Sequence, residues 1–181
     1  MGCDGAPDPC REWLVQCRED QRHPVALRAA GFDRVDTDER EIDSKGLRFS
    51  WTKVENGDAT ALRDELVSRA TDTVFDWPYT PPGRFALVLA LQAAGVPVWW
   101  FDADPEAAKQ SFDARAQGNL KNPQQGIQAN FASLRRGIES WHTVLLHLYG
   151  RRFLRTLFAG GTRMPLLRIW DTLCAVEGWT P

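Results

Sequence analysis

Residues 96–101 read Val-Pro-Val-Trp-Trp-Phe (VPVWWF), an apolar run between two segments with helical patterning. The preceding stretch, 83–94, ends at a glycine, and the following one, 104–115, opens with an Asp-Pro pair that suits a helix start. A run that is apolar at almost every position is typical of a parallel strand buried on both faces. Because side chains alternate across a strand, we expect at least one of Trp99 and Trp100 in the core.

Outward from this strand, short β-rich runs alternate with helical periods. The other predicted strands cover residues 32–36, 73–77 and 152–158, and the predicted helices cover 58–69, 83–94, 104–115, 130–149 and 165–178. This alternation predicts an α/β fold with a three-layer parallel sheet flanked by helices. Residues 117–128 are polar and rich in turn formers, so we expect a mobile loop there.

The composition fits one globular domain. The chain has 181 residues, 43% of them hydrophobic, and a formal net charge of −2. Its longest apolar stretch, residues 85–101, is too short and interrupted to span a bilayer, and the amino terminus has no secretory signal pattern. We therefore expect a cytoplasmic protein that binds neither membrane nor nucleic acid. Residues 105–181 carry ten basic and five acidic side chains, which suits either phosphate binding or a solvated helix surface.

Residues 31–41, GFDRVDTDERE, resemble the second strand and substrate loop of shikimate-kinase-like P-loop kinases. In that family a D-x-D pair follows a short strand and lies near the phosphate-accepting hydroxyl and the metal. The resemblance implies that Asp36 and Asp38 hold the acceptor, since a carboxylate beside a hydroxyl can orient it or take its proton. An acidic turn that caps a helix has the same pattern, and this interpretation stays open.

Residues 96–115, VPVWWFDADPEAAKQSFDAR, look like the nucleoside-monophosphate-kinase branch of the P-loop proteins. There an arginine after this strand and helix opens the lid and contacts the transferred phosphates. The resemblance assigns that role to Arg115 and the lid to 117–128, because phosphoryl transfer needs positive charge around the moving group. Complementing the helix dipole is the alternative role for Arg115. Asp76, in the strand TVFDW, would hold a metal-bound water as a Walker B carboxylate does.

The phosphate-binding loop of such kinases is missing. They begin with an apolar strand, G-x-x-x-x-G-K-[ST] and a helix, and no segment of this chain has that pattern. Residues 1–30 are polar, with no predicted strand and a helical pattern at 11–20. If the coding sequence is read in a frame shifted one nucleotide downstream, however, the codons between Trp13 and Gln21 permit the sequence S-G-x-x-x-V-G-K-T-S. The codons before them permit an apolar strand. We expect the nucleotide-binding segment there, either lost or hidden by a shifted reading frame.

Two functional hypotheses follow from the sequence. The first is a kinase-like domain at 31–181, preceded by an atypical segment at 1–30 in place of the first strand and P-loop. The resemblance implies that it moves a phosphoryl group from ATP, with Mg²⁺, to a small-molecule acceptor. The second is a non-catalytic binding or regulatory domain that keeps a degenerate P-loop fold. As given, the chain lacks the lysine and the Ser or Thr of the loop, so we expect weak or absent ATP turnover.

Overall fold

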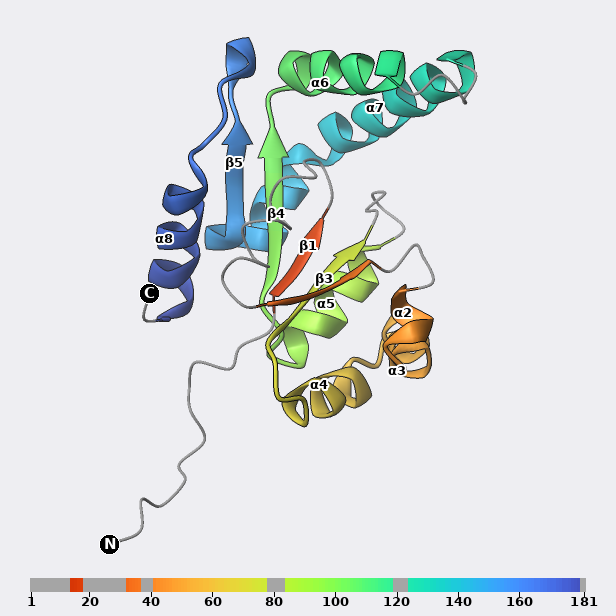
Figure 1. Ribbon diagram of the computed structural model, residues 1–181, viewed down its shortest axis with the longest axis vertical. Coiled ribbons are helices and arrows are strands. Elements are labelled where there is room, and N and C mark those ends of the chain that lie inside the picture. The colour runs from red at the N-terminus through yellow and green to blue at the C-terminus, as the bar shows by residue number, and fades with distance from the viewer. Residues whose placement is uncertain (1–13, 18–31, 37–40, 78–83, 119–123, 180–181) are drawn as a thin grey trace, which may run out of the picture.

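The computed structural model describes residues 14–17, 32–36, 41–77, 84–118 and 124–179 (Figure 1). The described strands are β1 (Leu14–Cys17), β2 (Asp33–Asp36), β3 (Thr73–Trp77), β4 (Val98–Ala103) and β5 (Phe153–Leu157). The described α-helices are α2 (Glu41–Ser44), α3 (Arg48–Glu55), α4 (Thr60–Val67), α5 (Phe85–Ala93), α6 (Pro105–Gly118), α7 (Gln124–Tyr149) and α8 (Leu166–Glu177). Two short 3-10 turns, η1 (Gly150–Arg152) and η2 (Ala159–Gly161), flank β5.

The described strands form one five-stranded sheet in which every pairing is parallel. Their order across the sheet is β2-β3-β1-β4-β5. The whole of β1 pairs with β3 on one side, and Val15 and Gln16 pair with Val98 and Trp99 of β4 on the other. Because all the strands run the same way, their carboxyl ends lie at one edge of the sheet, the upper edge in Figure 1.

Strand β1 corrects the prediction for residues 1–30, where no strand was expected and residues 11–20 had a helical pattern. Its sequence, Leu-Val-Gln-Cys, is only four residues long, and so short a run does not distinguish a strand from a helix turn. Position in the sheet decides the outcome, because β1 lies between two partner strands that bond to its backbone groups. Residues 14–17 therefore belong to the same sheet as the strands of the 31–181 segment.

The other four strands lie within two residues of their predicted positions. Strand β3 matches at both ends. Strand β4 begins at Val98 instead of at residue 96, because Pro97 has no N–H to donate to a neighbouring strand. The predicted end of the last helix is also confirmed: α8 stops at Gly178, whose φ of 78° is left-handed and whose N–H donates to the carbonyl of Cys174.

Helices pack against both faces of the sheet, and β4 divides its side chains between the two cores. Val98 and Trp100 pack on one face with side chains from β2, β3, α2 to α5 and α7. Trp99 and Phe101 pack on the other face with α8. Every residue of β4 is buried. Both tryptophans are therefore core residues, and the predicted α/β class with a parallel sheet is confirmed.

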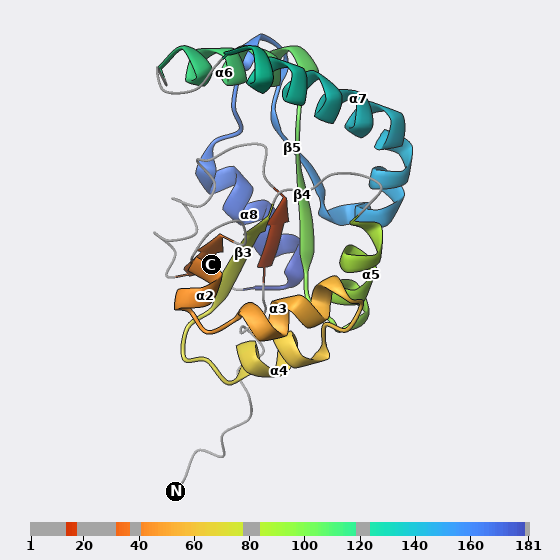
Figure 2. The same cartoon turned by 90° about the vertical axis from the view of Figure 1, so that its right-hand side faces the viewer.

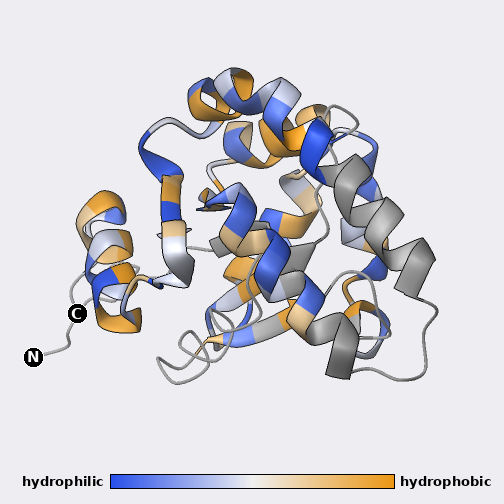
Figure 3. Cartoon of the chain, turned by 90° about the horizontal axis from the view of Figure 1, so that it is seen from above, coloured by the Kyte–Doolittle hydropathy of each residue, from blue (hydrophilic) through white to orange (hydrophobic). Residues whose placement is uncertain are grey.

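Helices α6 and α7 form an antiparallel arm across the carboxyl edge of the sheet (Figures 1 and 2). Figure 3 looks down on this edge from above. The mobile loop predicted at 117–128 is wrong at both ends, because residues 117 and 118 belong to α6 and residues 124–128 belong to α7, while residues 119–123 lie outside the described residues. The glutamines among residues 124–128 are polar, and for that reason the sequence predicts a loop there, but glutamine is also a good helix former. None of the described helices combines the length and the apolar character needed to cross a membrane.

A buried ionic cluster fastens α8 to the sheet. Glu177, at the end of α8, has a side chain that is only 1% exposed. Its carboxylate accepts two hydrogen bonds from the guanidinium of Arg152, at 2.7 Å each, and one from the indole N–H of Trp99 at 2.9 Å. These three donors compensate the charge of Glu177 inside the protein.

We expect Arg152→Gln to lower the free energy of unfolding by about 3 kcal/mol, because it leaves the buried Glu177 carboxylate without its ionic partner. Urea denaturation followed by tryptophan fluorescence measures the change. The matched control is Arg151→Gln, which removes an exposed neighbour and should cost less than about 0.5 kcal/mol. Equal effects of the two substitutions would contradict this account of the cluster.

Candidate functional site

Two of the predicted site residues meet at the carboxyl edge of the sheet. Asp36 is the last residue of β2, Asp76 is the fourth of β3, and their backbones are register partners. Adjacent strands lie about 4.8 Å apart, so the two Cα atoms are neighbours. Asp76 is also the register partner of Gln16 in β1. The structure describes only the backbone of Asp36 and Asp76, and Asp38 lies outside the described residues.

Arg115 lies on the arm above this edge. It belongs to the last turn of α6, where the structure describes its backbone, and α6 crosses the carboxyl end of the sheet (Figures 1 and 2). Of the segment between Trp13 and Gln21, residues 14–17 form β1 and the others lie outside the described residues. The structure therefore brings Asp36 and Asp76 together and puts Arg115 on α6, above the same end of the sheet, with no described contact between Arg115 and the two aspartates.

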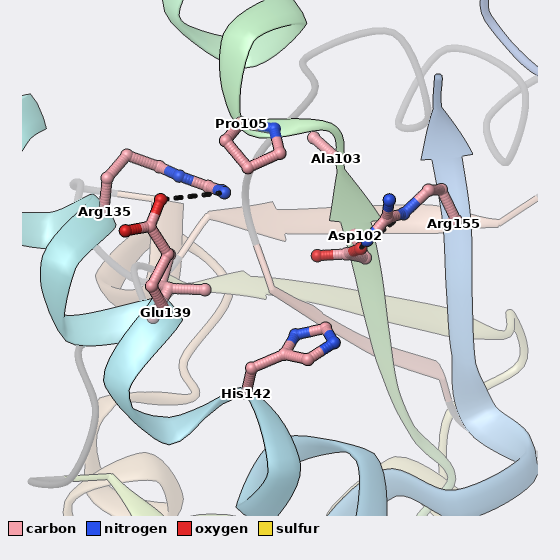
Figure 4. Close-up of a pocket in the computed structure, with 8 residues that line it drawn as sticks. Asp102, Ala103, Pro105, Arg135, Glu139, His142 and Arg155 are labelled. Carbon is pink, nitrogen blue, oxygen red and sulfur yellow. Dashed lines mark hydrogen bonds and ion pairs between the residues drawn. The ribbon is translucent and has the colours of Figure 1, made fainter. Parts of the chain in front are cut away.

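A cavity of about 300 Å³ opens farther along the same edge, between β4, β5 and α7 (Figure 4). Its polar lining consists of Asp102 from β4, Arg155 from β5, and Arg135, Glu139 and His142 from α7. The volume is at the lower end of the range for small-molecule pockets. None of these five residues was predicted as a site residue from the sequence.

Asp102 and Arg155 face one another because they are register partners in adjacent strands. The guanidinium donates from Nε to Oδ2 of Asp102 at 2.6 Å and also contacts that oxygen through Nη2. The side chain of Asp102 is 2% exposed, whereas that of Arg155 is 41% exposed. The buried carboxylate is therefore neutralised by an arginine that reaches it from the solvent side.

Arg135, Glu139 and His142 come from one face of α7, since residues four and seven positions apart lie on the same side of a helix. Nη2 of Arg135 lies 3.9 Å from Oε1 of Glu139, a loose ion pair. The His142 ring packs edge-on against Phe153 with the ring centroids 5.5 Å apart. The Arg-x₃-Glu-x₂-His spacing was visible in the sequence, but nothing in the sequence shows that this face turns toward the end of β4.

The cavity and the aspartate pair occupy separate places on the same edge. Gln16 is the register partner of Asp76 in β3 and of Trp99 in β4. Asp102 thus lies three residues beyond the level of Asp76, about 10 Å along the strand. Strand β1 stands between β3 and β4 and adds about 10 Å across the sheet.

Within the described part of the chain, no group of three or more His, Cys, Asp or Glu residues is arranged to hold a metal ion. Asp76, the predicted metal residue, is described by its backbone alone. Neither protein-family models nor curated proteins give a match to this sequence. The function is therefore argued from the geometry of the chain itself.

We expect Arg155→Gln to destabilise the fold by about 2 kcal/mol, because Asp102 remains buried without its cationic partner. The cost is smaller than for a fully buried pair, since water reaches the arginine side of this one. Chemical denaturation of Arg155→Gln, Asp102→Asn and the double variant measures the coupling. The double variant should be at least about 1 kcal/mol more stable than the sum of the single effects predicts. Additive effects would contradict a direct interaction.

Proposed function

We propose that this chain has the fold of an ATP-dependent small-molecule phosphotransferase of the P-loop class, with its acceptor site at the carboxyl edge of the sheet. The three-layer arrangement of that class is supported by helices on both faces of an all-parallel sheet. The central position of β1 supports it further, since the class begins with a buried strand that leads into the phosphate-binding loop.

The strand order favours ligand binding beside β1. The connection that follows β1 passes over β3 and leads to β2. The connection that follows β3 passes over β1 in the opposite direction and leads to β4. The connections that leave β1 and β3 therefore diverge, and in open α/β sheets a crevice forms at the carboxyl ends where neighbouring connections diverge. The pairing of Asp36 with Asp76 beside this point is the observation that carries the proposal.

In the proposed site, Asp36 and Asp38 orient the hydroxyl of the acceptor, and Asp76 holds a metal-bound water. Carboxylates suit both tasks. Arg115 on the arm would supply positive charge to the phosphates, as phosphoryl transfer requires. These roles come from the resemblance to the kinases, and the positions of Asp36, Asp76 and Arg115 along one edge support them.

The residues after β1 do not fit the phosphates of ATP. Strand β1 ends at Cys17, and the sequence continues Arg-Glu-Asp-Gln-Arg-His-Pro-Val. This run has neither the glycines of a P-loop nor its lysine and Ser or Thr, and Glu19 and Asp20 add two acidic residues to it. We therefore propose that this chain has the phosphotransferase fold without ATP turnover.

A non-catalytic binding domain is the second candidate function. It is favoured by the cavity at the end of β4, which is built by described residues of β4, β5, α6 and α7 and contains no part of the segment between Trp13 and Gln21. Ligand binding there requires neither ATP nor the missing loop.

Nucleotide binding distinguishes these proposals. We expect no saturable binding of Mg²⁺–ATP to this chain by isothermal titration calorimetry. A version with residues 7–30 replaced by the shifted-frame translation should bind Mg²⁺–ATP, because it restores the Gly-Lys-Thr cradle. Changing the lysine of the restored loop to alanine is the control and should abolish binding.

Each result bears on a different part of the proposal. Saturable binding to the unaltered chain would show that phosphate is held elsewhere, contrary to the proposed loss of turnover. No binding to the restored version, when circular dichroism shows that it is folded, would refute the phosphotransferase fold. Sequencing the coding DNA across residues 1–30 tests the shifted frame independently.

A further inference from the structure

The cavity between β4, β5 and α7 has balanced charges. Asp102 and Glu139 contribute two negative charges, and Arg135 and Arg155 contribute two positive charges, so these four side chains sum to zero. A ligand with a net charge would leave this lining unbalanced, and uncompensated charge in a partly desolvated site is costly. A ligand that carries both signs preserves the balance.

The acidic group of such a ligand fits Arg135. The Arg135 side chain is 8% exposed, so its guanidinium lies largely away from water. Its pair with Glu139 is loose at 3.9 Å, and Glu139 is 55% exposed, so Glu139 can yield its place to a ligand. A guanidinium presents several N–H donors in one plane, which match the two oxygens of a carboxylate.

The basic group fits Asp102 and Glu139. Both contacts of Asp102 with Arg155 use Oδ2, and the other carboxylate oxygen points into the cavity (Figure 4). Among the described residues Oδ1 has no hydrogen-bond partner. An ammonium group between this oxygen and the displaced Glu139 carboxylate would satisfy both acceptors.

The rest of the lining is aliphatic. Ala103, Pro105 and Ile138 complete the wall, and Ala103 and Ile138 are each 3% exposed. The imidazole of His142, which packs edge-on against Phe153, is the one aromatic ring among the described residues that line this cavity. A small aliphatic side chain fills such a surface and gains stability with each CH₂ group that it buries.

We propose that this cavity binds an aliphatic α-amino acid, with its carboxylate on Arg135 and its ammonium between Asp102 and Glu139. This site is distinct from the acceptor site at Asp36 and Asp76, and it does not rest on the proposed phosphotransferase function. A ligand there joins α7 to the ends of β4 and β5, at the base of the arm that carries Arg115 (Figure 1).

Calorimetry with three compounds of nearly equal shape tests the charge pattern. We expect L-valine to bind this chain at least about tenfold more tightly than 2-hydroxy-3-methylbutanoate, which lacks the ammonium, or isobutylamine, which lacks the carboxylate; tenfold corresponds to about 1.4 kcal/mol. Equal affinity for valine and the hydroxy acid would overturn the proposal in favour of a simple anion site. No binding of valine would also overturn it.

Variants of the chain locate the binding. Glu139→Gln removes an exposed carboxylate, so the fold should tolerate it, and valine binding should weaken about tenfold while hydroxy acid binding does not weaken. Glu106→Gln on α6 is the matched control and should leave valine binding unchanged. Arg135→Lys keeps the charge but not the planar fork, and it should weaken valine and hydroxy acid alike. Unchanged valine affinity in Glu139→Gln and Arg135→Lys would place the ligand elsewhere and overturn the proposal.

Discussion

Burial of β4 on both faces is the constraint on which the rest of the structure depends. Its side chains alternate between two cores, so Trp100 contacts the Tyr149 and Phe153 rings on one side while Trp99 stacks on Phe101 on the other. Burying a large side chain stabilises a fold by about 2 kcal/mol, and two faces of such residues require helices on both sides. The parallel pairing then follows, because each helix must return the chain to the same end of the sheet.

Those features were the most predictable from sequence. The continuous apolar character of residues 98–101, the Gly178 helix end and the position of β3 depend on local chemistry that a sequence displays directly. Trp51 belongs to α3, and its ring stacks on that of Phe75 in the core with the ring centroids 5.5 Å apart. A tryptophan therefore gives little information about a binding site unless its packing is known.

Strand β1 and the cavity could not be predicted, for a shared physical reason. The identity of residues 14–17 as a strand depends on partners sixty and eighty-three residues away, such as Val74 for Leu14 and Val98 for Val15. The cavity likewise combines side chains of α7 with side chains from the ends of β4 and β5, and these three elements are separate segments of the sequence. In contrast, Asp36 and Asp76 lie at or next to the ends of recognisable strands, and parallel pairing alone makes them neighbours. Residues whose placement follows from strand direction are predictable, and those whose placement depends on how a helix is rotated are not.

The polarity of the cavity follows from how β4 ends. A strand buried on both faces must return to polar residues where it leaves the core, and in this chain the first of them, Asp102, is still 2% exposed. A carboxylate so deep requires a cation, which the β4–β5 register supplies as Arg155, but that pairing uses only Oδ2. The second oxygen keeps its capacity to accept a hydrogen bond and faces the α7 side chains across the cavity. The need to end a fully buried strand thus produces a half-satisfied carboxylate at the wall of an open cavity, where a ligand can reach it and be selected by its charge pattern.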